Sequence, residues 1–100
     1  MLKVSELRPG MSNVDLEVRV VEVHEPKEIV MSGGVRRRIM ELRVEDGTGE
    51  MMLVLWDDKV IEDLDVGDTL RIKNGFVTSY RGVWRINVGR YGELERLNEE

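Results

Sequence analysis

Short runs in which apolar and charged residues alternate one by one constrain this chain more than any other feature of its sequence. The clearest run places Val14, Leu16, Val18 and Val20 between Asp15, Glu17 and Arg19. Successive side chains of a β-strand point to opposite faces, so this pattern predicts a strand with one buried face. Similar patterns predict strands over residues 36–44, 50–56, 69–79 and 83–88. The sequence therefore predicts an all-β protein.

Turn-forming residues separate these runs and set the order of the elements. Asp46-Gly47-Thr48-Gly49 predicts a tight hairpin, and Tyr80-Arg81-Gly82 predicts a second turn. The apolar phase slips between Val20 and Val21, which predicts a β-bulge. A side-chain oxygen of Asp57 or Asp58 is expected to cap a short helix across residues 59–64.

The element order predicts a five-stranded OB-fold barrel with a short helix between strands three and four. An SH3-like barrel is the alternative, but it does not account for the helix. A chain of 100 residues has room for one domain, which we expect over residues 1–92. Residues 93–100 carry four acids and one arginine, and they are expected to form a short acidic tail that folding does not require.

The charge distribution favours a polyanionic partner, although the net charge of −5 argues against one. The stretch from Thr69 to Gly92 contains no acid and has five bases: Arg71, Lys73, Arg81, Arg85 and Arg90. Local clustering of basic residues matters more to a polyanion than the total charge does. This stretch is therefore the predicted contact region.

Four of the five aromatic residues lie in the same acid-free stretch, and the fifth is Trp56. Rings interleaved with arginines suit single-stranded nucleic acid, because bases stack on the rings while the arginines hold phosphates. In the strand over residues 50–56, Met51, Leu53 and Leu55 share one face, so Trp56 is expected to point outward. Trp84 shares its phase with Ile86 and is expected to face the core; alternatively, it extends the stacking surface as a fourth ring.

Seven short motifs occur in order along the chain: Leu7-Arg8-Pro9-Gly10-Met11, Val18-Arg19-Val20, Asp46-Gly47-Thr48-Gly49, Leu55-Trp56, Val66-Gly67-Asp68, Asn74-Gly75-Phe76 and Tyr80-Arg81-Gly82. As a set, they resemble the archaeal single-stranded-DNA-binding proteins with a single OB-fold, which are similar to OB domains of replication protein A and to the sensor-of-ssDNA subunits. The resemblance implies base-stacking roles for Trp56, Phe76 and Tyr80. Phe76 stands where a tryptophan is common in that family.

These observations together predict sequence-tolerant binding of single-stranded DNA, by base stacking and phosphate contacts, in replication, recombination or repair. The phosphate contacts are expected from Arg37, Lys73, Arg81 and Arg85. The alternatives are a module that binds single-stranded RNA and a protein-interaction OB domain of a larger complex.

Catalysis, cofactors and metals are not expected. The chain has no cysteine, and its single histidine, His24, has no partner at a metal-ligand spacing. The sequence contains no apolar run of transmembrane length and no signal-peptide pattern, so a cytoplasmic location is expected.

Overall fold

The computed structural model describes residues 1–97, which form seven strands joined by turns and three 3-10 helices. The strands are β1 (Val14–Val23), β2 (Lys27–Val30), β3 (Arg36–Glu45), β4 (Glu50–Trp56), β5 (Thr69–Tyr80), β6 (Val83–Val88) and β7 (Glu93–Arg96). The 3-10 helices are η1 (Val4–Glu6), η2 (Ser32–Gly34) and η3 (Asp57–Lys59). The all-β prediction is confirmed, and its five strands correspond to β1, β3, β4, β5 and β6.

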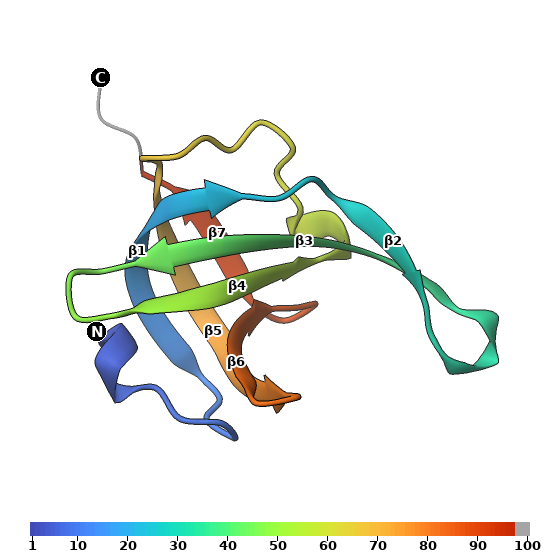
Figure 1. The fold of residues 1–100 in the computed structure, drawn as a ribbon, viewed down its shortest axis with the longest axis horizontal. Helices are drawn as coiled ribbons and strands as arrows, with labels where there is room; N and C mark the ends of the chain where they lie inside the picture. Colours follow the sequence, from blue (N-terminus) through green and yellow to red (C-terminus); the bar gives the residue numbers. More distant parts are fainter. Residues whose placement is uncertain (98–100) are drawn as a thin grey trace.

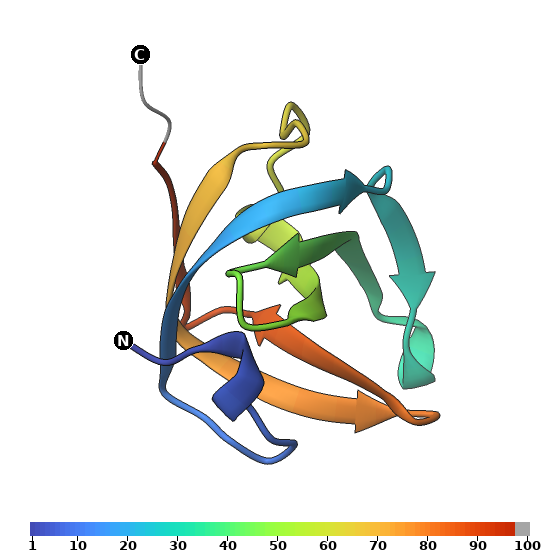
Figure 2. The ribbon, with the colours of Figure 1, turned by 60° about the vertical axis from the view of Figure 1, so that its left-hand side comes forward.

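The strand pairings form a closed circuit. They follow the order β1-β3-β4-β6-β5, and β1 also pairs with β5. The β4–β6 pairing is parallel and the other pairings are antiparallel. Figure 2 shows these strands curving around a common interior. Within residues 1–97, the short β2 pairs only with β3, and it extends with the first residues of β3 away from the rest of the molecule as a hairpin (Figure 1).

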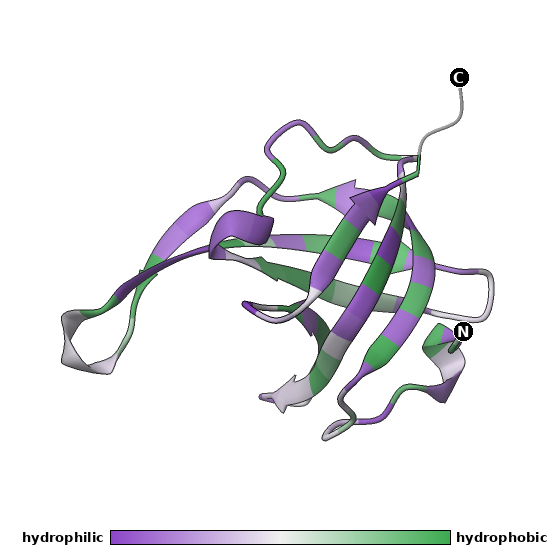
Figure 3. Cartoon of the chain, turned by 180° about the vertical axis from the view of Figure 1, so that it is seen from behind, coloured by the Kyte–Doolittle hydropathy of each residue, from purple (hydrophilic) through white to green (hydrophobic). Residues whose placement is uncertain are grey.

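The interior is filled by the apolar residues of the alternating pattern. Leu16, Leu53 and Ile72 are fully buried there, and they come from three different strands. The alternation appears along β1 and β5 as successive hydrophobic and hydrophilic bands (Figure 3). The predicted bulge in β1 is confirmed, because the register with β3 shifts between Val20 and Glu22.

A second bulge, which the sequence did not reveal, lies in the middle of β5. Leu16 pairs with Ile72, but Val14 pairs with Gly75, so β5 holds one extra residue. Asn74 lies at the bulge with a φ of 56°, in the left-handed region that asparagine tolerates. Ile72 is buried before the bulge and Val77 after it, so the inward positions change from even to odd numbers. The bulge thereby turns the side chains of Phe76, Thr78 and Tyr80 to the outside.

The predicted helix over residues 59–64 is wrong; the chain makes only the 3-10 turn η3. The Asp57 carboxylate does not cap this turn. It accepts hydrogen bonds from the Arg38 amide at 3.1 Å and from Arg37 Nε at 2.6 Å, and so fastens the turn to β3. Val60 then takes an extended conformation, and it packs with Ile61 against the core. Two adjacent β-branched residues in so short a segment do not sustain a helix.

Residues 93–96, expected to begin an acidic tail, form β7, which belongs to the sheet. Its residues pair with β5 from Leu70 to Lys73, and Leu94 packs against the core. The Arg96 guanidinium donates to Asp68 Oδ2 at 2.7 Å and to the Asp63 backbone oxygen at 2.7 Å. Residues 98–100 of the predicted tail lie outside the described residues.

Candidate nucleic-acid interface

One continuous outer surface, here called the ring face, spans β3, β4, β6 and the second half of β5. Cross-strand registers place nine of its residues side by side: Ile39, Glu41, Val54, Trp56, Phe76, Thr78, Tyr80, Arg85 and Asn87. Arg37 joins them, because its guanidinium lies over the Trp56 ring. The core takes Met51, Leu53 and Leu55 of β4, so the predicted outward position of Trp56 is confirmed. Three of the five aromatic rings therefore share one face.

The spacing of the three rings follows from the sheet geometry. Phe76 and Tyr80 are four residues apart on one strand, which corresponds to about 13 Å. Trp56 lies on β4, two strand positions from β5 across β6, at a lateral distance of about 10 Å. Tyr80 is 58% exposed and Phe76 is 39% exposed, whereas Trp56 is half-buried. The rings are therefore spread out as separate flat surfaces on the exterior.

Asn87 lies beneath these rings and fixes the Trp56 side chain. Its Oδ1 accepts a hydrogen bond from Trp56 Nε1 at 3.1 Å. Its Nδ2 donates to the Phe76 backbone oxygen at 3.2 Å and to Thr78 Oγ1 at 3.0 Å. Only 3% of Asn87 is exposed, so both ends of its amide are buried and satisfied. Asn87 therefore holds the indole in one orientation.

Guanidinium groups lie over two of the three rings. The Arg37 guanidinium is 5.0 Å from the centre of the Trp56 ring, and those of Arg81 and Arg85 are 5.2 and 5.9 Å from that of Tyr80. These distances permit cation–π attraction. The Arg38 amide and the Arg37 guanidinium hold the pKa of Asp57 below its ordinary value, so the Asp57 carboxylate stays ionised and keeps Arg37 over the ring.

The basic stretch predicted from the sequence acquires acidic neighbours from other strands. Arg85 lies 3.5 Å from Glu41 of β3, and Glu41 also contacts Lys27 at 3.2 Å. Arg71 contacts acids on both β1 and β7. Within residues 1–97, Arg81 has no ion-pair partner. It is therefore the cation of the ring face with the greatest freedom to meet a phosphate.

Arg37, Arg81 and Arg85 lie with the rings, but Lys73 does not. Lys73 precedes the bulge at Asn74, and its register partner is Glu93 of β7. Its neighbours are thus acids on another part of the surface. The structure brings together six of the seven predicted site residues and separates the seventh from them.

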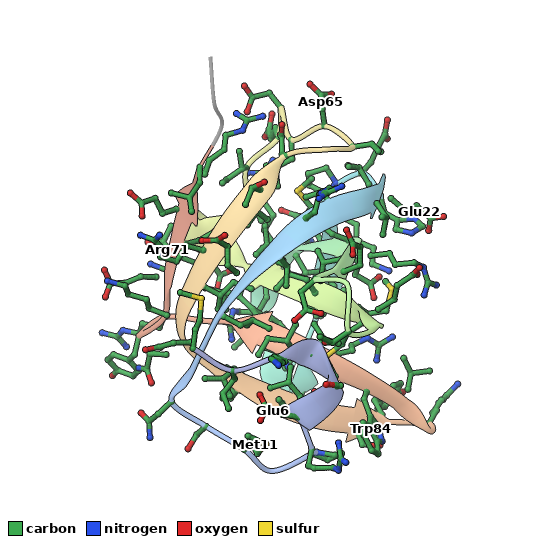
Figure 4. The ribbon with its side chains drawn as sticks, turned by 90° about the vertical axis from the view of Figure 1, so that its left-hand side faces the viewer. Glu6, Met11, Glu22, Asp65, Arg71 and Trp84 are labelled. Carbon is green, nitrogen blue, oxygen red and sulfur yellow. The ribbon has the colours of Figure 1, made fainter. Side chains whose placement is uncertain are left out.

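Trp84 does not occupy the core as expected. It keeps the inward phase of Ile86 and Val88, but it lies at the beginning of β6, beyond the packed interior, and is 43% exposed. Figure 4 shows it beside η1, near the end of the sheet. The Arg8 guanidinium is 5.9 Å from the centre of its ring.

Residues 1–97 contain neither a cluster of metal-ligating side chains nor a membrane-spanning helix. No group of three histidine, aspartate or glutamate side chains there could hold a metal ion. His24 contacts only Glu22 among the acids, with Nε2 2.8 Å from Oε1. No helix in this part of the chain is long and apolar enough to cross a membrane.

Residues 7–96 match a protein family described as single-stranded DNA binding protein Ssb-like, OB fold. The chain belongs to this family. The match includes β7 and ends at Arg96, in agreement with the strand boundaries of the structure.

Two archaeal relatives of this Ssb-like chain cover nearly all of it. The single-stranded DNA binding protein Ssb of Saccharolobus solfataricus is 34% identical over 98 residues, which are 98% of this chain and 65% of that protein. Replication factor A of Methanothermobacter thermautotrophicus is 31% identical over 97% of this chain and 13% of that protein. The chain thus spans less than two thirds of the length of either relative.

Solved structures confirm the OB fold of the Ssb-like chain. The second OB-fold domain of replication protein A from Methanococcus maripaludis superposes with a TM-score of 0.82, over 99% of this chain and 96% of that domain, at 23% identity. A replication factor A related protein from Methanobacterium thermoautotrophicum gives a TM-score of 0.78 over 98% of this chain and 91% of that chain, at 23% identity.

Proposed function

We propose that this Ssb-like chain binds single-stranded DNA with little sequence preference, and that it catalyses no reaction. The observation that carries the proposal is the ring face, on which Trp56, Phe76 and Tyr80 lie outward beside three arginines. The family description and the name of the relative from Saccharolobus solfataricus support the same ligand. The proposed role is in replication, recombination or repair, in the cytoplasm.

The proposed mechanism divides the ligand between two kinds of side chain. Every base has a flat π-face, so stacking on Trp56, Phe76 and Tyr80 tolerates any sequence. Arg37, Arg81 and Arg85 lie close enough to the rings to engage the adjoining phosphates. A duplex keeps its bases stacked inside the helix, so it cannot offer their faces to the rings and should bind much more weakly.

Alanine substitution of any one ring should weaken binding. We expect Trp56→Ala, Phe76→Ala and Tyr80→Ala each to cost about 1–3 kcal/mol of binding free energy, the contribution of one base–aromatic stack. Fluorescence anisotropy of a labelled oligo(dT) measures the loss. Tyr91→Ala is the matched control, because Tyr91 is 78% exposed but lies in the loop between β6 and β7, outside the ring face.

Thermal unfolding of the same variants tests the assignment of the rings. Phe76→Ala and Tyr80→Ala should leave the melting temperature nearly unchanged. Trp56→Ala should cost about 1–3 kcal/mol in free energy of unfolding, because it leaves the buried Asn87 Oδ1 without its partner. Truncating a core aromatic would cost roughly 3–5 kcal/mol. A variant that unfolds would show that its ring is structural.

Parallel titrations with oligo(dT) and oligo(rU) show whether single-stranded DNA or RNA is the preferred ligand. A titration with duplex DNA tests the stacking mechanism, because equal affinity for duplex and single strand would contradict it.

Salt should weaken binding in proportion to the number of phosphates that the arginines neutralise. Binding releases condensed counterions, so the logarithm of the affinity should fall linearly with the logarithm of the salt concentration, with a slope of about −0.7 per phosphate contact. Arg81→Ala should reduce this slope by about one contact. Lys73→Ala should leave the slope unchanged, because Lys73 lies apart from the rings. If Lys73→Ala reduces the slope more than Arg81→Ala does, the single-stranded DNA crosses the part of β5 that pairs with β7.

A further inference from the structure

We propose that a pocket around Trp84 binds an additional nucleobase and its phosphate, from the same strand that occupies the ring face. This inference rests on the proposed function and extends it to a ring that the function does not use. The pocket has a volume of about 400 Å³ and lies between η1, the ends of β3 and β4, and the beginning of β6.

The pocket is continuous with the ring face along two strands. Its lining includes Met52 of β4, whose register partner is Arg85, and Val83 of β6, whose register partner is Tyr80. Directly opposed residues of paired strands lie about 5 Å apart. A strand whose base stacks on Tyr80 therefore passes the edge of this pocket as it leaves the ring face.

The side chains of the pocket match a nucleotide in shape and in charge. Trp84 provides a ring that is 43% exposed, and the neighbouring Val83 is also exposed. Arg8 and Arg43 line the same pocket with a single acid, Glu50, which lies 4.0 Å from Arg43. An indole face flanked by two guanidinium groups suits a base that stacks while its phosphate is neutralised.

The pocket is held in shape by hydrogen bonds. Arg8 Nη1 donates to the backbone oxygens of Ser5 at 3.2 Å and Leu7 at 2.7 Å, so its guanidinium stays over Trp84. The segment that carries Arg8 is tied to the β3–β4 hairpin, because the Val4 amide donates to Asp46 Oδ2 at 2.8 Å. A site that is already ordered loses little conformational entropy when it binds.

Fluorescence of Trp84 tests the inference directly. The chain has two tryptophans, so Trp56→Phe leaves Trp84 as the only indole and keeps a ring at position 56. OB folds occupy about 4–16 nucleotides, so we compare an oligo(dT) of about 4 with one of about 12. We expect the longer oligonucleotide to quench Trp84 and the shorter one to bind without quenching it. Tight binding of the longer oligonucleotide without any quenching would overturn the inference and leave the proposed function standing.

Affinity gives a second readout. Trp84→Ala should weaken binding of the longer oligonucleotide roughly fivefold or more, the lower limit for one stack, and leave the shorter one unaffected. Trp84→Phe should restore most of the loss, and Tyr91→Ala should have no effect at either length. If Trp84→Ala changes the oligomeric state in size-exclusion chromatography but not the affinity, the pocket binds a second copy and the inference is wrong. If no oligonucleotide binds at any length, the proposed function fails as well.

Discussion

A chain that ends at Gly92 should unfold at a much lower urea concentration than a chain that ends at Leu97. We expect it to lose about 2–3 kcal/mol in free energy of unfolding, since full burial of a leucine side chain contributes about 1.5–3 kcal/mol and Leu94 is partly buried. The shorter chain lacks Leu94, which packs on the core, and Arg96, which bonds to Asp68 and Asp63. It also loses the β7 pairing that covers one edge of β5.

Two point variants separate these contributions in the full chain. Leu94→Ala removes the apolar contact and retains the pairing, whereas Arg96→Ala removes the bonds to the η3–β5 connection. Urea melts followed by intrinsic fluorescence measure all four chains under the same conditions. Equal stability of the chains that end at Gly92 and Leu97 would mean that β7 contributes nothing to the free energy of unfolding.

Replacing Asn87 by leucine should lower both the stability and the affinity for single strands. The substitution keeps the number and branching of the side-chain heavy atoms but removes the partner of Trp56 Nε1 and of Thr78 Oγ1. Each hydrogen bond contributes about 0.5–1.5 kcal/mol, and a buried polar group left without a partner costs more, so we expect a loss of about 2–3 kcal/mol in free energy of unfolding. Binding should weaken as well, because the indole is no longer held in one orientation.

Thr78→Val is the matched control for this effect. It removes one hydrogen bond from the same network but leaves the bond between Asn87 and Trp56 intact. Its stability should fall by about 1 kcal/mol, with the affinity for oligo(dT) unchanged. If Thr78→Val weakens binding as much as Asn87→Leu, the network supports the whole sheet and does not act through Trp56.

Local patterns in the sequence were sufficient to predict the main strands and the outward position of Trp56. Both features depend on the two-residue period of a strand, which a single segment displays by itself. The strand β7 is too short to display this period. Its four residues include one apolar side chain, that of Leu94, beside Glu93, Glu95 and Arg96. Without knowledge of its partner strand, a four-residue strand with one apolar side chain cannot be distinguished from a polar tail.

Features that depend on pairing between distant segments could not be predicted. The stretch from Thr69 to Gly92 contains no acid, yet Glu17, Glu41 and Glu95 reach its arginines from β1, β3 and β7. Those contacts are set by the strand registers. The registers cannot be predicted from the order of charges along the chain. The burial of Asn87 depends in the same way on Trp56, which is 31 residues away.

The bulge at Asn74 divides β5 into two halves that can vary independently of each other. The first half pairs with β1 and β7. In the second half, Phe76 and Tyr80 pair with β6 and with neither of those strands. Under the proposed function, point substitutions at positions 76 and 80 can therefore change the ligand preference while the first half stays the same. Loss of one residue at the bulge would exchange interior and exterior along the entire second half. The geometry of β5 therefore accommodates substitutions on this surface more readily than insertions or deletions.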